Sequence, residues 1–139
     1  MTADCSACGG GWPRADHRLG ELDTSVAYLN EDQFFAGWTF LVLKRHATEI
    51  YQLSRDERAR LMEDVSAVAQ ALAAVFAPVK VNYELLGNQV AHIHWHVIPR
   101  LAGDPAPRMP TWTVQHEPRA LPPAALAERL ASIRARLPR

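Results

Sequence analysis

Hydrophobic residues gather in short runs along most of this chain and recur with helical spacing in two segments. The runs rich in β-branched, aromatic and other apolar residues predict four strands, at Ser25–Asn30, Trp38–Lys44, Val79–Leu86 and Val90–Ile98. Phe34–Gly37 predicts the bend between the first two strands, and Gly87-Asn88 a turn between the last two. We expect Pro99 to end the fourth strand, because proline lacks an N–H for a sheet.

The strongest local signal is the start of a helix at Ser54. Ser54-Arg-Asp-Glu57 is a capping box, in which the Ser54 hydroxyl bonds the third helical amide while Glu57 reaches back. Apolar residues then recur every three or four positions, which predicts one buried helix face: Leu61, Val65, Val68, Leu72 and Val75 or Phe76. Pro78 ends this long helix.

A second helix is predicted over Ala124–Leu137, opened by Pro122-Pro123, where a missing N–H costs nothing. The segments Cys5–Asp16 and 102–118 contain many Gly or Pro residues and predict turns and irregular chain. The order of strands, long helix, strands and helix is typical of an α+β domain with a mainly antiparallel sheet. No repeat or low-complexity linker interrupts it, so we expect one domain over residues 1–139.

Composition excludes several classes of protein. The 139 residues carry 15 Lys and Arg against 15 Asp and Glu, and 48% are apolar, so an intrinsically disordered chain is excluded. A balanced charge lacks the basic surface that binds long nucleic acids or anionic membranes. No stretch has the length of a membrane span or the pattern of a signal peptide. We therefore expect a soluble globular domain located in the cytoplasm.

Three of the six histidines lie within five residues, at His92, His94 and His96. In a strand, alternate side chains share a face, so these imidazoles are expected in a groove while Ile93, Trp95 and Val97 pack under the long helix. The outer two imidazoles would be ~13 Å apart, whereas each reaches roughly 6 Å from its Cα to a metal, so all three cannot share one ion. A two-histidine metal site, or a division into ligand and catalyst, both remain open.

Imidazole is a good nucleophile that is largely neutral near pH 7. A histidine in a groove that binds phosphate therefore suits the two-step transfer of a phosphoryl or nucleotidyl group. A neighbouring histidine can donate a hydrogen bond to the oxygen where charge develops.

The segment His92-Ile-His94-Trp-His96-Val-Ile-Pro99-Arg100, preceded by Gly87-Asn-Gln89-Val90, resembles the histidine triad family of nucleotide hydrolases and transferases. The resemblance covers Cys5 to Leu101, leaves 102–139 as a variable tail with a terminal helix, and is greatest to the bacterial branch similar to diadenosine polyphosphate hydrolases. It implies a five-stranded, mainly antiparallel sheet with one long helix and a C-terminal helix. It also implies a homodimer.

By position, the resemblance makes His94 the nucleophile that attacks the α-phosphorus, with its other ring nitrogen held by a backbone carbonyl. His96 would bond the phosphoryl oxygen. Asn30 would bond the ribose hydroxyls, although it also suits a turn before Glu31 and Asp32. Asn82 and Gln89 would contact phosphate or orient the nucleophile, with Gln89 standing where Ser or Thr is usual.

Cys5 and Cys8 form a Cys-x-x-Cys pair, which suits a redox dithiol or half of a zinc site. The pair precedes every predicted element, whereas a thioredoxin-like pair needs a strand before it and a helix after it, so zinc is favoured. Two thiolates do not complete a tetrahedron. The resemblance supplies His46 and His92 as the other ligands of a structural zinc.

Other residues carry weaker expectations. His17 and His116 are predicted at the surface, and Trp38 replaces a histidine frequent in the family after the hairpin glycine. Trp12 and Trp112 suit either stacking on a purine or local packing.

Three functions follow from these residues. The first is a hydrolase or transferase that cleaves a nucleoside phosphate derivative through a nucleotidyl-histidine. The second is a nucleotide-binding regulatory module with little turnover. The third is a hydrolase with a catalytic zinc.

Overall fold

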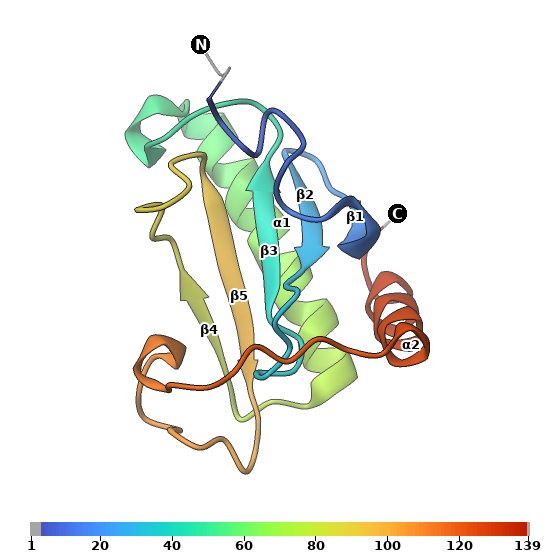
Figure 1. The fold of residues 1–139 in the computed structure, drawn as a ribbon. Helices are drawn as coiled ribbons and strands as arrows, with labels where there is room; N and C mark the ends of the chain where they lie inside the picture. Colours follow the sequence, from blue (N-terminus) through green and yellow to red (C-terminus); the bar gives the residue numbers. More distant parts are fainter. Residues whose placement is uncertain (1–3, 139) are drawn as a thin grey trace.

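The computed structural model describes residues 4–138 as a five-stranded sheet with two α-helices on one face (Figure 1). The strands lie in the order β1-β2-β3-β5-β4, and every neighbouring pair is antiparallel. The elements in chain order are η1 (Ala15–His17), β1 (Arg18–Glu21), β2 (Ser25–Leu29), β3 (Thr39–Leu43), η2 (Ile50–Gln52), α1 (Arg55–Phe76), β4 (Lys80–Glu84), β5 (His94–Arg100), η3 (Thr111–Thr113) and α2 (Pro123–Arg134). The predicted α+β fold is confirmed. Residues 1–3 and 139 of the predicted domain lie outside the described residues.

Helix α1 begins at the predicted capping box. The Glu57 amide donates to Ser54 Oγ at 3.1 Å, and the Ser54 amide donates to Glu57 Oε2 at 2.7 Å. The helix ends where Ala77 takes a left-handed conformation, with φ of 47°, just before Pro78. The start of the helix is thus explained by side-chain capping of backbone amides, and its end by the left-handed residue before proline.

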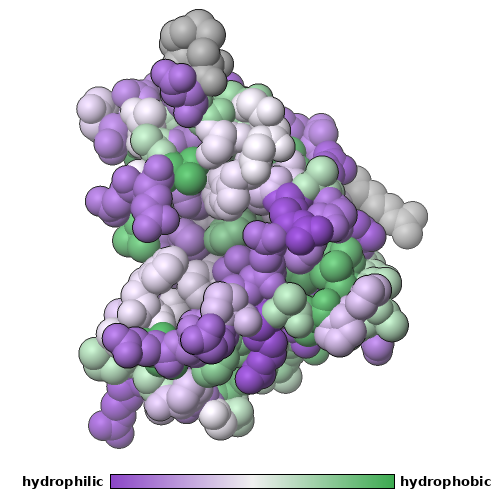
Figure 2. All heavy atoms as spheres, in the orientation of Figure 1, coloured by the Kyte–Doolittle hydropathy of each residue, from purple (hydrophilic) through white to green (hydrophobic). Residues whose placement is uncertain are grey.

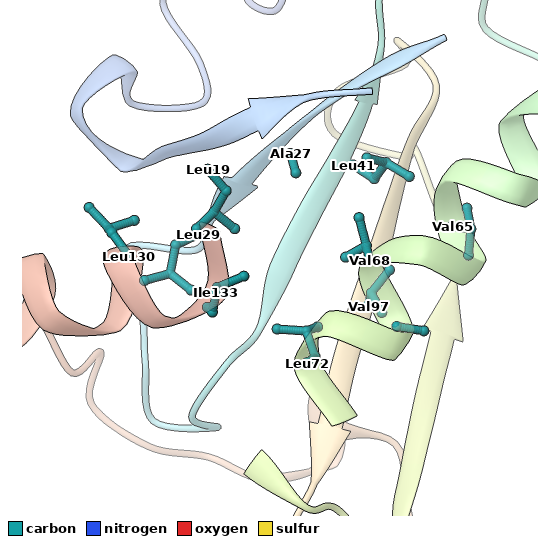
Figure 3. Close-up of a cluster of buried hydrophobic side chains, with 11 residues drawn as sticks. Leu19, Ala27, Leu29, Leu41, Val65, Val68, Leu72, Val97, Leu130 and Ile133 are labelled. Atoms are coloured by element: carbon teal, nitrogen blue, oxygen red, sulfur yellow. The ribbon is translucent and has the colours of Figure 1, made fainter. Parts of the chain in front are cut away.

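The core lies between the sheet and the two helices (Figure 3). Alternate residues of β3 and β5, among them Leu41 and Val97, point toward Val68 of α1. Leu130 and Ile133 of α2 extend the same core toward Leu19 and Leu29. The tail helix is therefore part of the core. The packing of the apolar side of β5 under α1 agrees with the prediction.

The histidine strand differs from its predicted bounds. β5 begins at His94 and continues through Pro99 to Arg100, instead of running from Val90 to Ile98. β3 pairs with β5 only as far as Val97, so beyond that residue one side of β5 has no strand partner in the sheet. A proline is accommodated where the ladder does not need its N–H.

The chain after β5 crosses the sheet face opposite to α1 and then reaches α2 (Figure 1). This tail is pinned to the loop after β2, because the Gln33 amide donates to the Arg119 carbonyl at 2.8 Å and the Arg119 amide donates to Asp32 Oδ1 at 2.9 Å. The tail thus brings residues 111–116 over the face that carries the histidines. Within residues 4–138, no helix is both long enough and apolar enough for a membrane crossing.

Candidate active site and metal site

His94 and His96 leave β5 on the face opposite to the helices and line a hollow of about 430 Å³. The other walls come from Trp12 of the N-terminal loop, the loop 86–90 and Trp112 of the tail. Figure 2 shows this face, which is hollowed between its upper and lower parts. Three distant segments of the chain therefore meet around two histidines.

His94 is held by a backbone carbonyl. Its Nδ1 lies 2.8 Å from the oxygen of His92, and since a carbonyl only accepts, Nδ1 carries the proton and Nε2 the lone pair. Burial lowers the pKa of His94, although the bond to His92 opposes this. The Trp12 indole meets the imidazole edge-on, with ring centroids 4.7 Å apart. His94 is thus a buried, neutral imidazole with a lone pair on Nε2.

His96 lies two residues further along the same face. Its Nδ1 is 3.1 Å from Nε1 of Trp38, and its ring is surrounded by Phe40, His94 and Trp112 with centroids 5.1 to 5.5 Å away. Burial, with a smaller contribution from the neighbouring His94, lowers the pKa of His96 to about 4. His96 is therefore neutral near pH 7.

Cys5, Cys8, His46 and His92 form a tight cluster, and their ligand atoms all lie within 4.8 Å of one another. His92 Nδ1 is 3.5 Å from each sulfur and 3.3 Å from His46 Nδ1, and Cys8 Sγ is 3.4 Å from His46 Nδ1. A tetrahedral zinc separates sulfur and nitrogen ligands by about 3.5 Å and two nitrogens by about 3.3 Å. These four separations therefore match those of a tetrahedral zinc site.

His92 belongs to this cluster and not to the histidine face of β5. The prediction that three alternating imidazoles share one strand face was wrong for His92, since the chain bends there and the strand begins two residues later. His92 Nε2 lies 2.7 Å from the Leu43 carbonyl, which assigns the proton to Nε2 and leaves the Nδ1 lone pair toward the cysteines. The bend thus places one imidazole in the Cys/His cluster and leaves two in the hollow.

Asn30 and Gln89 both line the histidine hollow. Asn30 also has the alternative role expected for it, because its Oδ1 accepts the Asp32 amide at 3.2 Å and forms a turn. Gln89 lies in the loop before His92 and borders both the hollow and the Cys/His cluster. Both predicted residues therefore line the same hollow as His94 and His96.

Asn82 is placed elsewhere. Its Oδ1 accepts a hydrogen bond from Arg100 Nη1 at 2.7 Å, beside a second hollow of about 420 Å³ that the two histidines do not line. The other N–H groups of the buried Arg100 donate hydrogen bonds to Asp104 and to the carbonyls of Ala106 and Met109. Asn82 therefore helps to anchor the tail, a role that its sequence neighbours did not indicate.

Residues 14–103 match the family model of the HIT domain. The chain belongs to the HIT domain family. Protein hit of Bacillus subtilis is 28% identical over 101 residues, which are 69% of this chain and 68% of that protein. The adenosine 5'-monophosphoramidase hnt1 of Schizosaccharomyces pombe is 29% identical over 84 residues, 60% of this chain and 63% of that protein.

Solved structures support the HIT fold. A histidine triad protein from Bradyrhizobium japonicum superposes with a TM-score of 0.77 at 32% identity, covering 86% of this chain and 89% of that one. A Zn-bound histidine triad family protein from Mycobacterium smegmatis shares the fold, with a TM-score of 0.69 at 21% identity over 98% and 94% of the two chains.

Two further histidines of this HIT domain differ from expectation. His17 is buried, with Nδ1 3.2 Å from the Leu29 carbonyl, so its predicted surface position was wrong. His116 is half-buried, stacked on Phe34 and paired with Asp32 at 2.7 Å. Both partners are distant in sequence, so residue type and local pattern did not reveal them.

Proposed function

We propose that this HIT domain binds a nucleotide and cleaves a nucleoside phosphate derivative at its α-phosphate, with His94 as the nucleophile. The observation that carries the proposal is the bond between His94 Nδ1 and the His92 carbonyl, which leaves the lone pair on Nε2 of a residue that lines the hollow. The 29% identity over 84 residues to an adenosine 5'-monophosphoramidase supports the same chemistry.

The proposed reaction has two steps. His94 Nε2 attacks the α-phosphorus, the bond between phosphorus and the leaving group breaks, and the leaving group keeps the electron pair of that bond. The leaving group takes a proton from a water molecule, and the resulting hydroxide is neutralised by the proton released in the second step. The ring becomes positively charged, and its Nδ1–H bond to the His92 carbonyl strengthens in response. Water then cleaves the N–P bond, which releases a nucleoside monophosphate and restores neutral His94.

The remaining residues of the hollow suit binding. Asn30 would bond the ribose hydroxyls, Gln89 would contact phosphate from the loop before His92, and His96 would donate to a phosphoryl oxygen. The indoles of Trp12 and Trp112 supply apolar walls on either side of the histidine pair. Asn82 is left out of the proposed contacts because Arg100 occupies its oxygen.

We propose a structural zinc at Cys5, Cys8, His46 and His92. Four protein ligands fill the tetrahedron and leave no position for a reactive water, so the donor set favours a structural over a catalytic role. When bound, the metal would hold the N-terminal loop against the start of β5. The Zn-bound relative from Mycobacterium smegmatis supports the proposal.

The homodimer implied by the family also remains a proposal. β4 is an edge strand whose partner side is open in the described chain, and Val79, Tyr83 and Leu86 near it are 69%, 48% and 53% exposed. Static light scattering at micromolar concentration tests it, and a mass of one chain would reject it.

The function is tested by hydrolysis of a panel that contains diadenosine polyphosphates and adenosine phosphoramidates, with wild type and His94→Ala. We expect turnover of at least one class by wild type and a fall of about 10³-fold or more in His94→Ala. Calorimetry with AMP checks that the variant still binds. Equal turnover by both proteins rejects the nucleophile, and AMP binding by wild type without turnover of any substrate assigns a regulatory module instead.

A further inference from the structure

Trp38 makes a contact with His96 that has only one chemical interpretation. Indole Nε1–H is a donor and never an acceptor, so the 3.1 Å contact to His96 Nδ1 requires a lone pair on Nδ1. The proton of the neutral ring then lies on Nε2. An imidazolium has no lone pair and could not accept this bond.

The Trp38 side chain is firmly held. It is 4% exposed and packs edge-on against Phe35 and Trp112, with ring centroids 6.2 and 5.2 Å away. Its backbone oxygen accepts hydrogen bonds from the Asn30 amide and from Gln33 Nε2. Because the indole cannot move freely, its N–H is a fixed reference for the His96 ring.

The two histidines of the hollow are consequently set in opposite forms. The His92 carbonyl places the His94 proton on Nδ1, and Trp38 places the His96 proton on Nε2. One ring therefore offers a lone pair on Nε2 and the other offers an N–H at the same ring position. A nucleophile beside a hydrogen-bond donor is the combination that attack on a phosphoryl group requires.

We propose that Trp38 is a positioning residue that fixes His96 as the Nε2–H tautomer and so makes His96 an obligate donor to the reacting phosphoryl oxygen. A histidine, which is frequent at this position in the family, can either donate or accept a hydrogen bond, so it is compatible with both tautomers of the partner ring. An indole can only donate, so it is compatible with one tautomer. The catalytic consequence rests on the proposed function, whereas the tautomer does not.

The tautomer is measured by NMR of protein labelled with ¹⁵N in histidine and tryptophan, with His96 signals assigned by their loss in His96→Ala. We expect a protonated Nε2, an unprotonated Nδ1, and a scalar coupling across the hydrogen bond between Trp38 Nε1 and His96 Nδ1. The tautomer itself is read from the wild-type protein, and His96→Ala serves only to assign the signals. A proton on His96 Nδ1 overturns the proposal whether or not the protein turns over any nucleotide.

Kinetics of Trp38→Phe then test the catalytic consequence. We expect kcat to fall about three- to tenfold, the value of one neutral hydrogen bond, with KM changed by less than about twofold. Trp112→Phe is the matched control for the tautomer, since Trp112 packs on the same ring and donates to Glu84 instead. We expect its His96 signals to keep the wild-type pattern. Unchanged kcat in folded Trp38→Phe overturns the positioning role.

Discussion

The backbone oxygen of His92 lies 2.8 Å from Nδ1 of His94, so a residue of the Cys/His cluster directly holds the proposed nucleophile. A second link runs through the N-terminal loop, where the Ser6 carbonyl between the two cysteines accepts the amides of Gly11 and Trp12. Trp12 in turn packs on His94. A change in the Cys/His cluster is therefore expected to alter the hollow as well.

Loss of the proposed zinc should weaken the proposed catalysis, although none of the four zinc ligands is assigned a contact with the nucleotide. We expect Cys8→Ser to bind well under one zinc per chain, to melt at a lower temperature and to lose about tenfold or more in activity, because His92 and the loop that packs Trp12 on His94 would no longer be held. Ser6→Ala, in the same loop, should behave as wild type. Metal analysis, thermal melting and turnover check these outcomes, and a zinc-free Cys8→Ser with full activity would show that the two sites are independent.

Gly37 supports the turn before β3 for two separable reasons. Its φ is 89°, and a Cβ there would lie 2.7 Å from both Phe76 and Pro99, whereas Gly103 has φ of 88° and nothing within 4 Å. Gly103→Ala should therefore cost about 1 kcal/mol in unfolding free energy from backbone strain alone, and Gly37→Ala about 2–4 kcal/mol. Urea denaturation measures both values. Equal losses would mean that the close packing of Gly37 contributes nothing.

The Asp32–His116 pair should make the stability of the tail depend on pH. Its hydrogen bond raises the pKa of His116; burial alone would raise the pKa of Asp32, but hydrogen bonds from Arg119, His116 and Phe34 hold it below its usual value. The raised His116 pKa stabilises the fold below about pH 6.5, and this is lost as pH rises through the folded-state value. The lowered Asp32 pKa stabilises it above about pH 4, and this is lost as pH falls through the folded-state value.

The pair therefore contributes most between about pH 4 and about pH 6.5. We expect His116→Gln to lower the melting temperature more at about pH 5.5 than at about pH 8.5. In an Asp32→Asn background the same substitution should lose this pH dependence. A loss for His116→Gln that is equal at both pH values would exclude the ion pair as its cause.

Local chemistry made much of this fold predictable. The capping box at Ser54 and the proline after Ala77 determine α1 through contacts between sequence neighbours, and alternation along β5 correctly separated His94 and His96 from Trp95 and Val97. The four residues that the resemblance predicts as metal ligands also lie together in the Cys/His cluster. Each of these features depends on neighbours in sequence or on a motif with fixed spacing.

Features that depend on distant segments were missed. The edge strand β1 is short and was not located, because its signal comes from pairing with β2. The burial of His17 against Leu29, the bond between Asn82 and Arg100 and the stacking of His116 on Phe34 each join residues at least 12 positions apart in the sequence. A single sequence does not encode these contacts in any local pattern.

The proposed mechanism is tested most directly by identifying the residue that carries the nucleotidyl group. The wild-type protein is mixed in excess over a substrate that it hydrolyses and that is labelled at the α-phosphorus. The reaction is quenched rapidly under alkaline conditions that preserve phosphohistidine, and the labelled residue is identified by mass spectrometry. The proposed mechanism predicts the label on His94 in wild type and its absence in His94→Ala. Label on any other residue, or turnover by His94→Ala at the wild-type rate, would contradict it.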